Sequence, residues 1–180
     1  SEEPQVRLIN SKIWIQLLVT IGAALAVVWA GVITWEARAN RAAAIDQARS
    51  FSLSMHQATM AGLTGMMVTG TMAQRGVFLD QIKQLNAIRD VRVVRGDNVT
   101  KVFGPGQPDA ESSADALEQR VLVSGKEEVV VESDAKGEYL RAVRPALAGK
   151  AYLGKDCTVC HQVPEGAVLG VVSMKMSLDE

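Results

Sequence analysis

The segment Cys157-Thr158-Val159-Cys160-His161 carries the clearest chemical pattern in this 180-residue chain. Its CxxCH spacing is typical of the covalent attachment of a c-type haem. Two thiols at this spacing can each add to a vinyl group of one porphyrin, and the adjacent imidazole can then bind the iron from the proximal side. The pattern predicts one covalently bound haem c, attached through Cys157 and Cys160, with His161 as the proximal iron ligand.

Other uses of these side chains stay open at the level of sequence. The thiols are the only two in the chain and could form a disulfide or a redox dithiol, but no thioredoxin-like strand pattern precedes them. A zinc site with two cysteines and two histidines would need His56 together with His161, and these histidines lack the usual close spacing. A chance match is the remaining alternative.

The sixth position of the iron has two candidate ligands on one predicted helix. His56 and Met60 are spaced i, i+4 and therefore lie on the same helical face. Met60 is the preferred distal ligand, His56 is the alternative and water is the third option. Each choice sets the reduction potential and the access of gases differently.

Polar side chains near the motif are candidates for binding the carboxylates of the haem. Lys155 and Arg144 could neutralise the propionates, and Tyr152 could donate a hydrogen bond to one of them. An ordinary solvated surface explains these three residues about as well.

An uncharged apolar run extends from Ile13 to Trp35. A helix of this length, at about 1.5 Å per residue, crosses a hydrocarbon core of about 30 Å. Trp14 and Trp35 stand at its ends, where interfacial aromatic residues are common. A cleaved signal peptide is the alternative, but its apolar region is usually shorter and is followed by a clear cleavage site. We expect an uncleaved transmembrane helix over residues 13–35.

The charges that flank this run do not decide its orientation, because basic residues occur on both sides of it. Haem attachment decides the orientation instead, since thioethers form outside the cytoplasmic membrane in bacteria. We therefore expect a single-pass protein of the inner membrane. Residues 1–12 form its cytoplasmic tail, and the haem domain lies in the periplasm.

The rest of the chain predicts an α+β fold. Residues 36–72 have apolar side chains at helical spacing and are expected to continue the membrane helix as a periplasmic stalk. A domain over residues 73–180 follows, with one antiparallel sheet of about five strands, and the stalk helix is expected to cover one face of that sheet. The expected helices are 73–87 and 115–123, and the expected strands are 88–94, 99–103, 127–132, 138–144 and 167–176.

Longer stretches of the sequence resemble a known family. The segment HQATMAGLTGMMVTGT (56–71), the segment FLDQIKQLNAIRDVRVVRGD (78–97) and residues 140–180, which hold the CxxCH and a following VPEG, are similar to one class of receptor. That class is the bacterial methyl-accepting chemotaxis proteins whose N-terminal sensing region carries a periplasmic haem c domain. The resemblance covers nearly the whole chain. It implies a PAS-like domain with the haem inserted between the last two strands, and a longer receptor in which a second membrane helix and a signalling coiled coil follow.

The first functional hypothesis is a sensor of redox state or of a diatomic gas. A change of the sixth iron ligand would shift the stalk helix and so bias a two-state receptor. Such a receptor is expected to be a homodimer paired along the stalk and the span, where Gly22 and Ala26 form a small-xxx-small pattern.

The second hypothesis is a membrane-tethered monohaem cytochrome that passes electrons to a neighbouring membrane complex. An enzyme such as a peroxidase is not expected, because His56 is the only candidate for its distal histidine. The net charge of −1 and the lack of basic runs give no reason to expect nucleic acid as a partner.

Overall fold

The computed structural model describes residues 3–104 and 113–178, and the chain divides into two compact units, Ser1–Ala44 and Ile45–Glu180. Helix α1, Glu3–Thr69, makes up the described part of the first unit and continues without interruption into the second. Among the described residues it is the one helix long and apolar enough to cross a membrane, and the predicted span lies within it. The helix is followed by Gly70, whose φ of +72° is a left-handed conformation common at the ends of helices.

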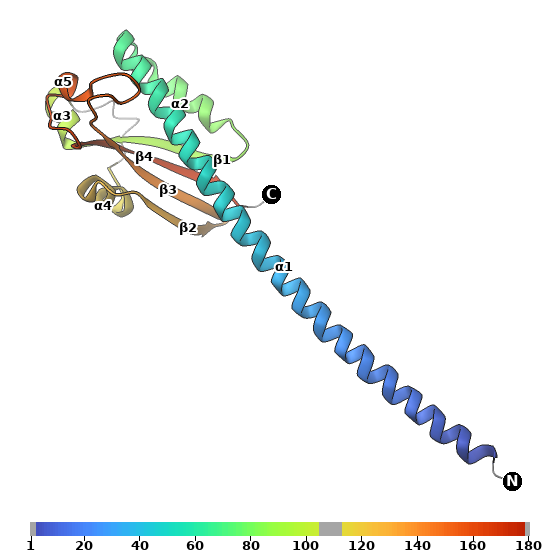
Figure 1. Ribbon diagram of the computed structural model, residues 1–180. Coiled ribbons are helices and arrows are strands. Elements are labelled where there is room, and N and C mark those ends of the chain that lie inside the picture. Colours follow the sequence, from blue (N-terminus) through green and yellow to red (C-terminus); the bar gives the residue numbers. More distant parts are fainter. Residues whose placement is uncertain (1–2, 105–112, 179–180) are drawn as a thin grey trace. The chain divides into compact units, whose positions relative to one another are not determined.

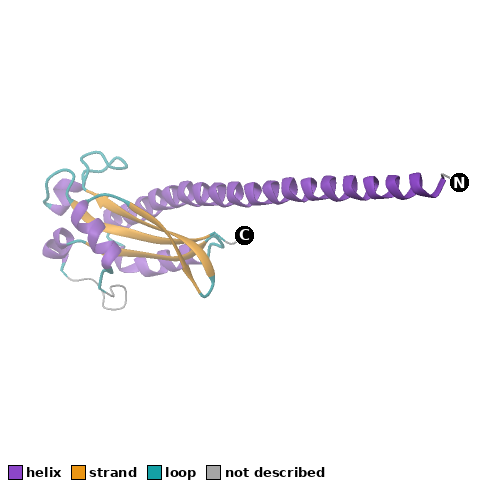
Figure 2. Ribbon diagram, turned by 90° about the horizontal axis from the view of Figure 1, so that it is seen from below, coloured by secondary structure: helices purple, strands orange, loops and turns teal. Residues whose placement is uncertain are grey.

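The second unit is built on a four-stranded antiparallel sheet (Figures 1 and 2). Strand β4 lies in the middle and pairs with β1 on one side and β3 on the other, so the strand order is β1-β4-β3-β2. The fold is therefore α+β, as predicted. The strands are β1 (Ile88–Arg95), β2 (Glu128–Asp134), β3 (Gly137–Leu147) and β4 (Val168–Ser177).

The predicted strand over residues 99–103 is wrong, because these residues belong to helix α3, Asp97–Phe103. In so short a segment, Val99 and Phe103 fit both the alternation of a strand and one face of a helix. The described sheet therefore has four strands where about five were expected.

Tertiary contacts explain why this segment leaves the sheet after β1. The Asn98 side-chain amide donates to the Val168 carbonyl at 3.1 Å, and the Gly96 amide donates to the Leu169 carbonyl at 2.8 Å. Both bonds tie the start of α3 to the first residues of β4. The helix is thus anchored where a strand over residues 99–103 was expected.

The remaining helices agree with the expected positions. Helix α2, Arg75–Lys83, follows a short 3-10 turn, η1, at Met72–Gln74. Helix α4, Ala116–Ser124, begins at a capping box and stops at a residue with a left-handed backbone. The box pairs Asp115 with Glu118, and the left-handed residue is Gly125.

Two clusters of buried apolar side chains cover opposite faces of the sheet. Neighbouring residues of β4 alternate between them, since Val171 belongs to the α4 cluster and Val172 to the cluster beneath α1 and α2. Met60 and Leu63 of α1 pack in the second cluster. The prediction that the stalk portion of α1 covers one face of the sheet is confirmed (Figure 1).

Candidate functional site

The CxxCH lies in the long loop that joins β3 to β4. This loop closes on itself, because Ala148 donates to the Ala167 carbonyl at 2.9 Å and Gly166 donates to the Ala148 carbonyl at 2.7 Å. Cys157 is tied to the start of the loop by a bond from its amide to the Gly149 carbonyl, at 2.9 Å. The motif is therefore presented by a loop whose two ends are held together.

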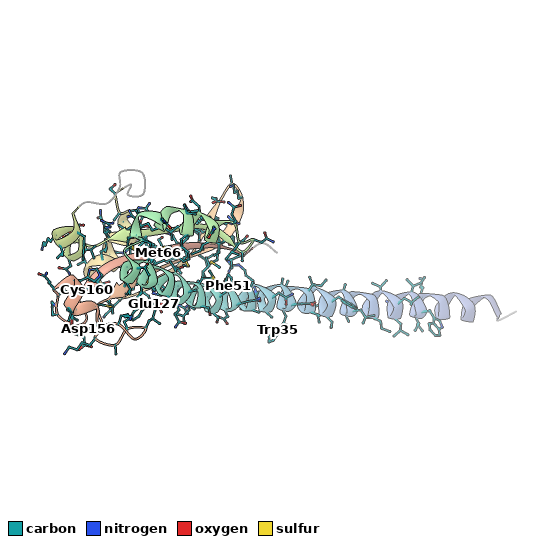
Figure 3. The ribbon with its side chains drawn as sticks, turned by 90° about the horizontal axis from the view of Figure 1, so that it is seen from above. Trp35, Phe51, Met66, Glu127, Asp156 and Cys160 are labelled. Carbon is teal, nitrogen blue, oxygen red and sulfur yellow. The ribbon has the colours of Figure 1, made fainter. Side chains whose placement is uncertain are left out.

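The motif itself forms the short helix α5, Cys157–His161. The Asp156 carboxylate caps its first turn by accepting from the Thr158 amide at 2.9 Å. Helical geometry puts Cys157 and Cys160 one turn apart, and both are free thiols, the first half-buried and the second exposed. Figure 3 shows Asp156 and Cys160 beside the end of α1 that carries Met66.

A cavity of about 560 Å³ opens beside α5 and is lined mainly by apolar side chains. It brings together residues that are far apart in the sequence, from α1, β1, α3, the β3–β4 loop and β4. Six of the candidate residues lie in its lining: Cys157, Cys160, His161, Met60, Tyr152 and Lys155. The volume lies in the range of small-molecule and cofactor sites.

His161 is largely withdrawn from water, with 7% of its surface exposed. Burial lowers the pKa of its imidazole, which therefore stays neutral at physiological pH and keeps a lone pair for a metal. Its Nδ1 is buried and has no hydrogen-bond partner among the described residues. Phe103 packs edge-on against the imidazole, with ring centroids 5.2 Å apart and planes at 76°.

The two candidate distal ligands differ in their position. Met60 is 8% exposed and lines the same cavity as the two cysteines and His161. His56 is one helical turn earlier and is also buried, but it is not among the described residues that line the cavity. Burial first, and then the charge of Arg144, lower the pKa of His56 to about 4, with Glu127 acting in the opposite direction.

Arg144 belongs to a buried polar cluster next to the core rather than to the cavity lining. Its Nη1 donates to the Ser52 hydroxyl at 2.9 Å, and its Nε donates to the Glu127 carboxylate at 2.8 Å. The Ser52 hydroxyl in turn donates to the Arg49 carbonyl of α1 at 2.8 Å. These bonds fix α1 against β3 and occupy the guanidinium that was a candidate for a propionate.

The remaining propionate candidates, Tyr152 and Lys155, belong to a tight turn in the cavity lining. The Lys155 amide donates to the Tyr152 carbonyl at 2.9 Å, and the two central residues, Leu153 and Gly154, have positive φ. Burial raises the pKa of the Tyr152 phenol, with a smaller contribution from Cys157. Tyr152 therefore remains a hydrogen-bond donor at physiological pH.

These residues fit a covalently attached haem. A neutral buried imidazole follows two free thiols one turn apart. All three side chains line an apolar cavity that is also lined by the thioether side chain of Met60. Zinc fits less well, because the described residues contain no group of three or more His, Cys, Asp or Glu side chains placed to hold a metal ion. The two histidines and two cysteines thus do not form a four-ligand zinc site.

Among the lining residues that sequence reasoning missed are Arg75, Arg95 and Phe103. Arg95 directly follows the predicted strand 88–94 and Phe103 ends the predicted strand 99–103, so the wrong assignment of the second segment as a strand hid the role of Phe103. Arg75 carries no local signal, because its position in the cavity comes from the packing of α2. The i, i+4 spacing of the apolar residues Val99 and Phe103 would have indicated a helix, with both side chains on the face that lines the cavity.

No protein-family model and no curated protein matches this chain. The resemblance to haem-containing chemotaxis receptors and the PAS-like character of the fold therefore remain expectations.

Proposed function

We propose that this chain is the membrane-anchored, periplasmic, c-type haem sensor region of a chemotaxis-type receptor. Its stimulus is a change of redox state or a diatomic gas at the iron. Cys157 and Cys160 attach the haem, His161 binds the iron and Met60 is the distal ligand. The domain is PAS-like, and the receptor is a homodimer paired along α1.

The observation that carries this proposal is the composition of one cavity wall. The three residues of the motif and Met60 line the same cavity, although they are about 100 residues apart in the sequence. Met60 comes from α1, the same helix that contains the apolar run. A change at the sixth ligand position would therefore act on a helix that also enters the membrane.

When bound, the haem supplies an iron that changes oxidation state and can exchange a ligand. The residues of the chain position and protect it. His161 offers a neutral nitrogen because burial opposes its protonation, and Phe103 holds the ring in place. The lining of the cavity is mainly apolar, and an apolar shell of this kind limits the access of solvent to a bound metal. Ser52 and Arg144 keep the segment of α1 before Met60 against the sheet.

Spectra of the haem-loaded protein test the proposal. Met60→Ala should abolish the spectral signature of a thioether ligand and open the ferrous iron to carbon monoxide. Met67→Ala is the matched control, because Met67 lines the same cavity from the same helix but is 42% exposed. Ligation that is the same in both oxidation states, with no gas bound by the parent or by Met60→Ala, would remove the basis of the sensing function.

A tethered electron carrier is the second candidate. It is favoured by exposed apolar side chains at the motif, Val159 at 72% and Leu153 at 52%, which could dock a redox partner. The same spectra distinguish the two functions. A carrier keeps both axial ligands in both oxidation states, since reorganisation at the iron slows electron transfer.

A further inference from the structure

The charged side chains that line the cavity are mostly basic. Among the described lining residues, Arg75, Arg95 and Lys155 are cationic and Asp156 is the one carboxylate. Asp156 accepts hydrogen bonds from the Thr158 hydroxyl at 2.6 Å and the Thr158 amide at 2.9 Å, which keep it at the start of α5 and lower its pKa. The three cationic side chains in the lining therefore favour an anionic ligand in the cavity.

The two arginines differ from the lysine in burial. Arg75 opens α2 and is 9% exposed, and Arg95 ends β1 and is half-buried, whereas Lys155 is exposed. Nη1 of Arg95 donates to the Gly104 carbonyl at 3.2 Å, which holds this side chain beside the end of α3. A guanidinium withdrawn from water is stabilised by an anion, and its planar fork matches a carboxylate through two parallel hydrogen bonds.

We propose that Arg75 and Arg95 bind the two carboxylates of the haem. This inference rests on the proposed haem function and assigns residues that the motif does not contain. A haem has an apolar macrocycle with two carboxylates at one edge. The cavity offers an apolar lining together with two withdrawn guanidiniums on α2 and β1. The attachment edge and the carboxylate edge are thus held by different elements, the β3–β4 loop and the α2–β1 side of the cavity.

The two arginines also set how the iron responds to pH. A guanidinium beside a carboxylate favours its ionised form, so propionate protonation is confined to acidic pH. The positive charge near the iron favours the ferrous state over the ferric state and raises the reduction potential. Loss of either arginine should therefore lower the potential. The potential decreases over the pH range in which the propionate loses its proton. Without the arginine the propionate loses its proton at a higher pH, so this range should shift toward neutral pH.

Spectroelectrochemical titration of the full haem-loaded chain, repeated over a range of pH, measures both effects. The variants are Arg75→Gln, Arg95→Gln and the charge-preserving Arg75→Lys and Arg95→Lys. Lys101→Gln is the control, because Lys101 is an exposed residue of α3 outside the cavity lining and its loss removes the same charge. We expect each glutamine variant to shift both the potential and its pH profile, with the lysine variants restoring most of the potential and Lys101→Gln matching the parent.

The outcomes separate the two proposals. If the parent carries haem and the glutamine variants match Lys101→Gln in both potential and pH profile, the carboxylate assignment is wrong while the haem function stands. If the parent carries no haem, the proposed function fails and this inference fails with it. Should one glutamine variant fail to mature, the other glutamine variant decides: a shift in potential and pH profile relative to Lys101→Gln supports the assignment, and values that match Lys101→Gln contradict it.

Discussion

His56 shows how the environment of one residue can change both its role and the pH response of the protein. It is buried between the core and the Arg144 guanidinium, and its pKa lies at about 4, below the ordinary value of 6.5. The folded state therefore holds His56 neutral over a range of pH in which the unfolded chain would protonate it.

The sign of the resulting pH dependence follows from this difference. Between pH 6.5 and 4 the unfolded state binds the extra proton, so the free energy of unfolding decreases as the pH falls through this window. At pH 5 the neutral burial of His56 should lower the free energy of unfolding by about 2 kcal/mol relative to pH 7. Urea unfolding at pH 7 and pH 5 should show this loss in the parent, and His56→Gln should reduce it. An equal loss in both proteins would mean that His56 titrates normally.

Glu118 illustrates the difference between a buried and an exposed charge. It is fully buried, caps α4 through the Asp115 amide at 3.1 Å and pairs with Arg92 at 3.3 Å and Arg141 at 3.4 Å. Glu128 on β2 instead pairs with Arg120 at 2.7 Å near the surface.

Truncation of these two acids should therefore have unequal costs. Glu118→Ala removes a fully buried carboxylate that pairs with Arg92 and Arg141, and it should lower the free energy of unfolding by about 3–5 kcal/mol. Glu128→Ala should cost much less, because its pair with Arg120 is exposed to solvent. Denaturant titration of both variants measures the difference, and similar small losses would show that the Glu118 cluster contributes little to stability.

At the scale of elements, the close approach of α1 and α2 depends on one glycine. A side chain at Gly62 would collide with the Phe78 ring of α2, whereas one at Gly65, a turn later on the same helix, would meet nothing within 4 Å. Both glycines lie inside a helix, where alanine is favoured over glycine by about 1 kcal/mol.

These two positions form a matched pair of substitutions. Gly65→Ala should stabilise the protein by up to about 1 kcal/mol, because only helix propensity changes. Gly62→Ala should destabilise it by about 1–3 kcal/mol, because the Phe78 ring must move out of a packed core. Thermal unfolding of both variants provides the comparison, and a stabilising Gly62→Ala would show that α2 can move away from α1 at no cost.

Elements with one unambiguous signal could be predicted from the sequence, and those with two competing signals could not. Helix α4 was predicted because Asp115 and Gly125 mark both of its ends, and β4 was predicted because a mostly apolar segment of ten residues fits the centre of a sheet. Helix α3 was missed because its apolar residues fit both periods and its anchor, the Asn98–Val168 hydrogen bond, is a long-range contact.

The candidate site divides in the same way. The cysteines and His161 are adjacent in the sequence, so their pattern is readable without a structure. Arg75 and Arg95 reach the cavity only through the packing of α2 and β1, and Arg144 is drawn away from it by Ser52 and Glu127. The local sequence around an arginine does not indicate whether its side chain lines the cavity, because that depends on how the elements pack.

At the scale of the whole molecule, the proposed function needs α1 to be inserted in the membrane. We expect the full chain to stay in the membrane pellet after an alkaline wash, and its haem domain to be cut by protease added to spheroplasts. Leu25→Arg places a charge in the middle of the apolar run and should weaken insertion by about 2.5–3.5 kcal/mol. Release of the parent chain into the wash would contradict membrane anchoring.

The central claim is that Cys157 and Cys160 hold a haem covalently. The most direct measurement is the intact mass and the absorption spectrum of the denatured chain after expression in a host that matures c-type cytochromes. The parent should carry the mass of one haem and absorb as a haem bound through two thioethers, and the Cys157→Ala/Cys160→Ala variant should have lost both signals. A parent chain that has its bare polypeptide mass and no haem absorption would contradict the account.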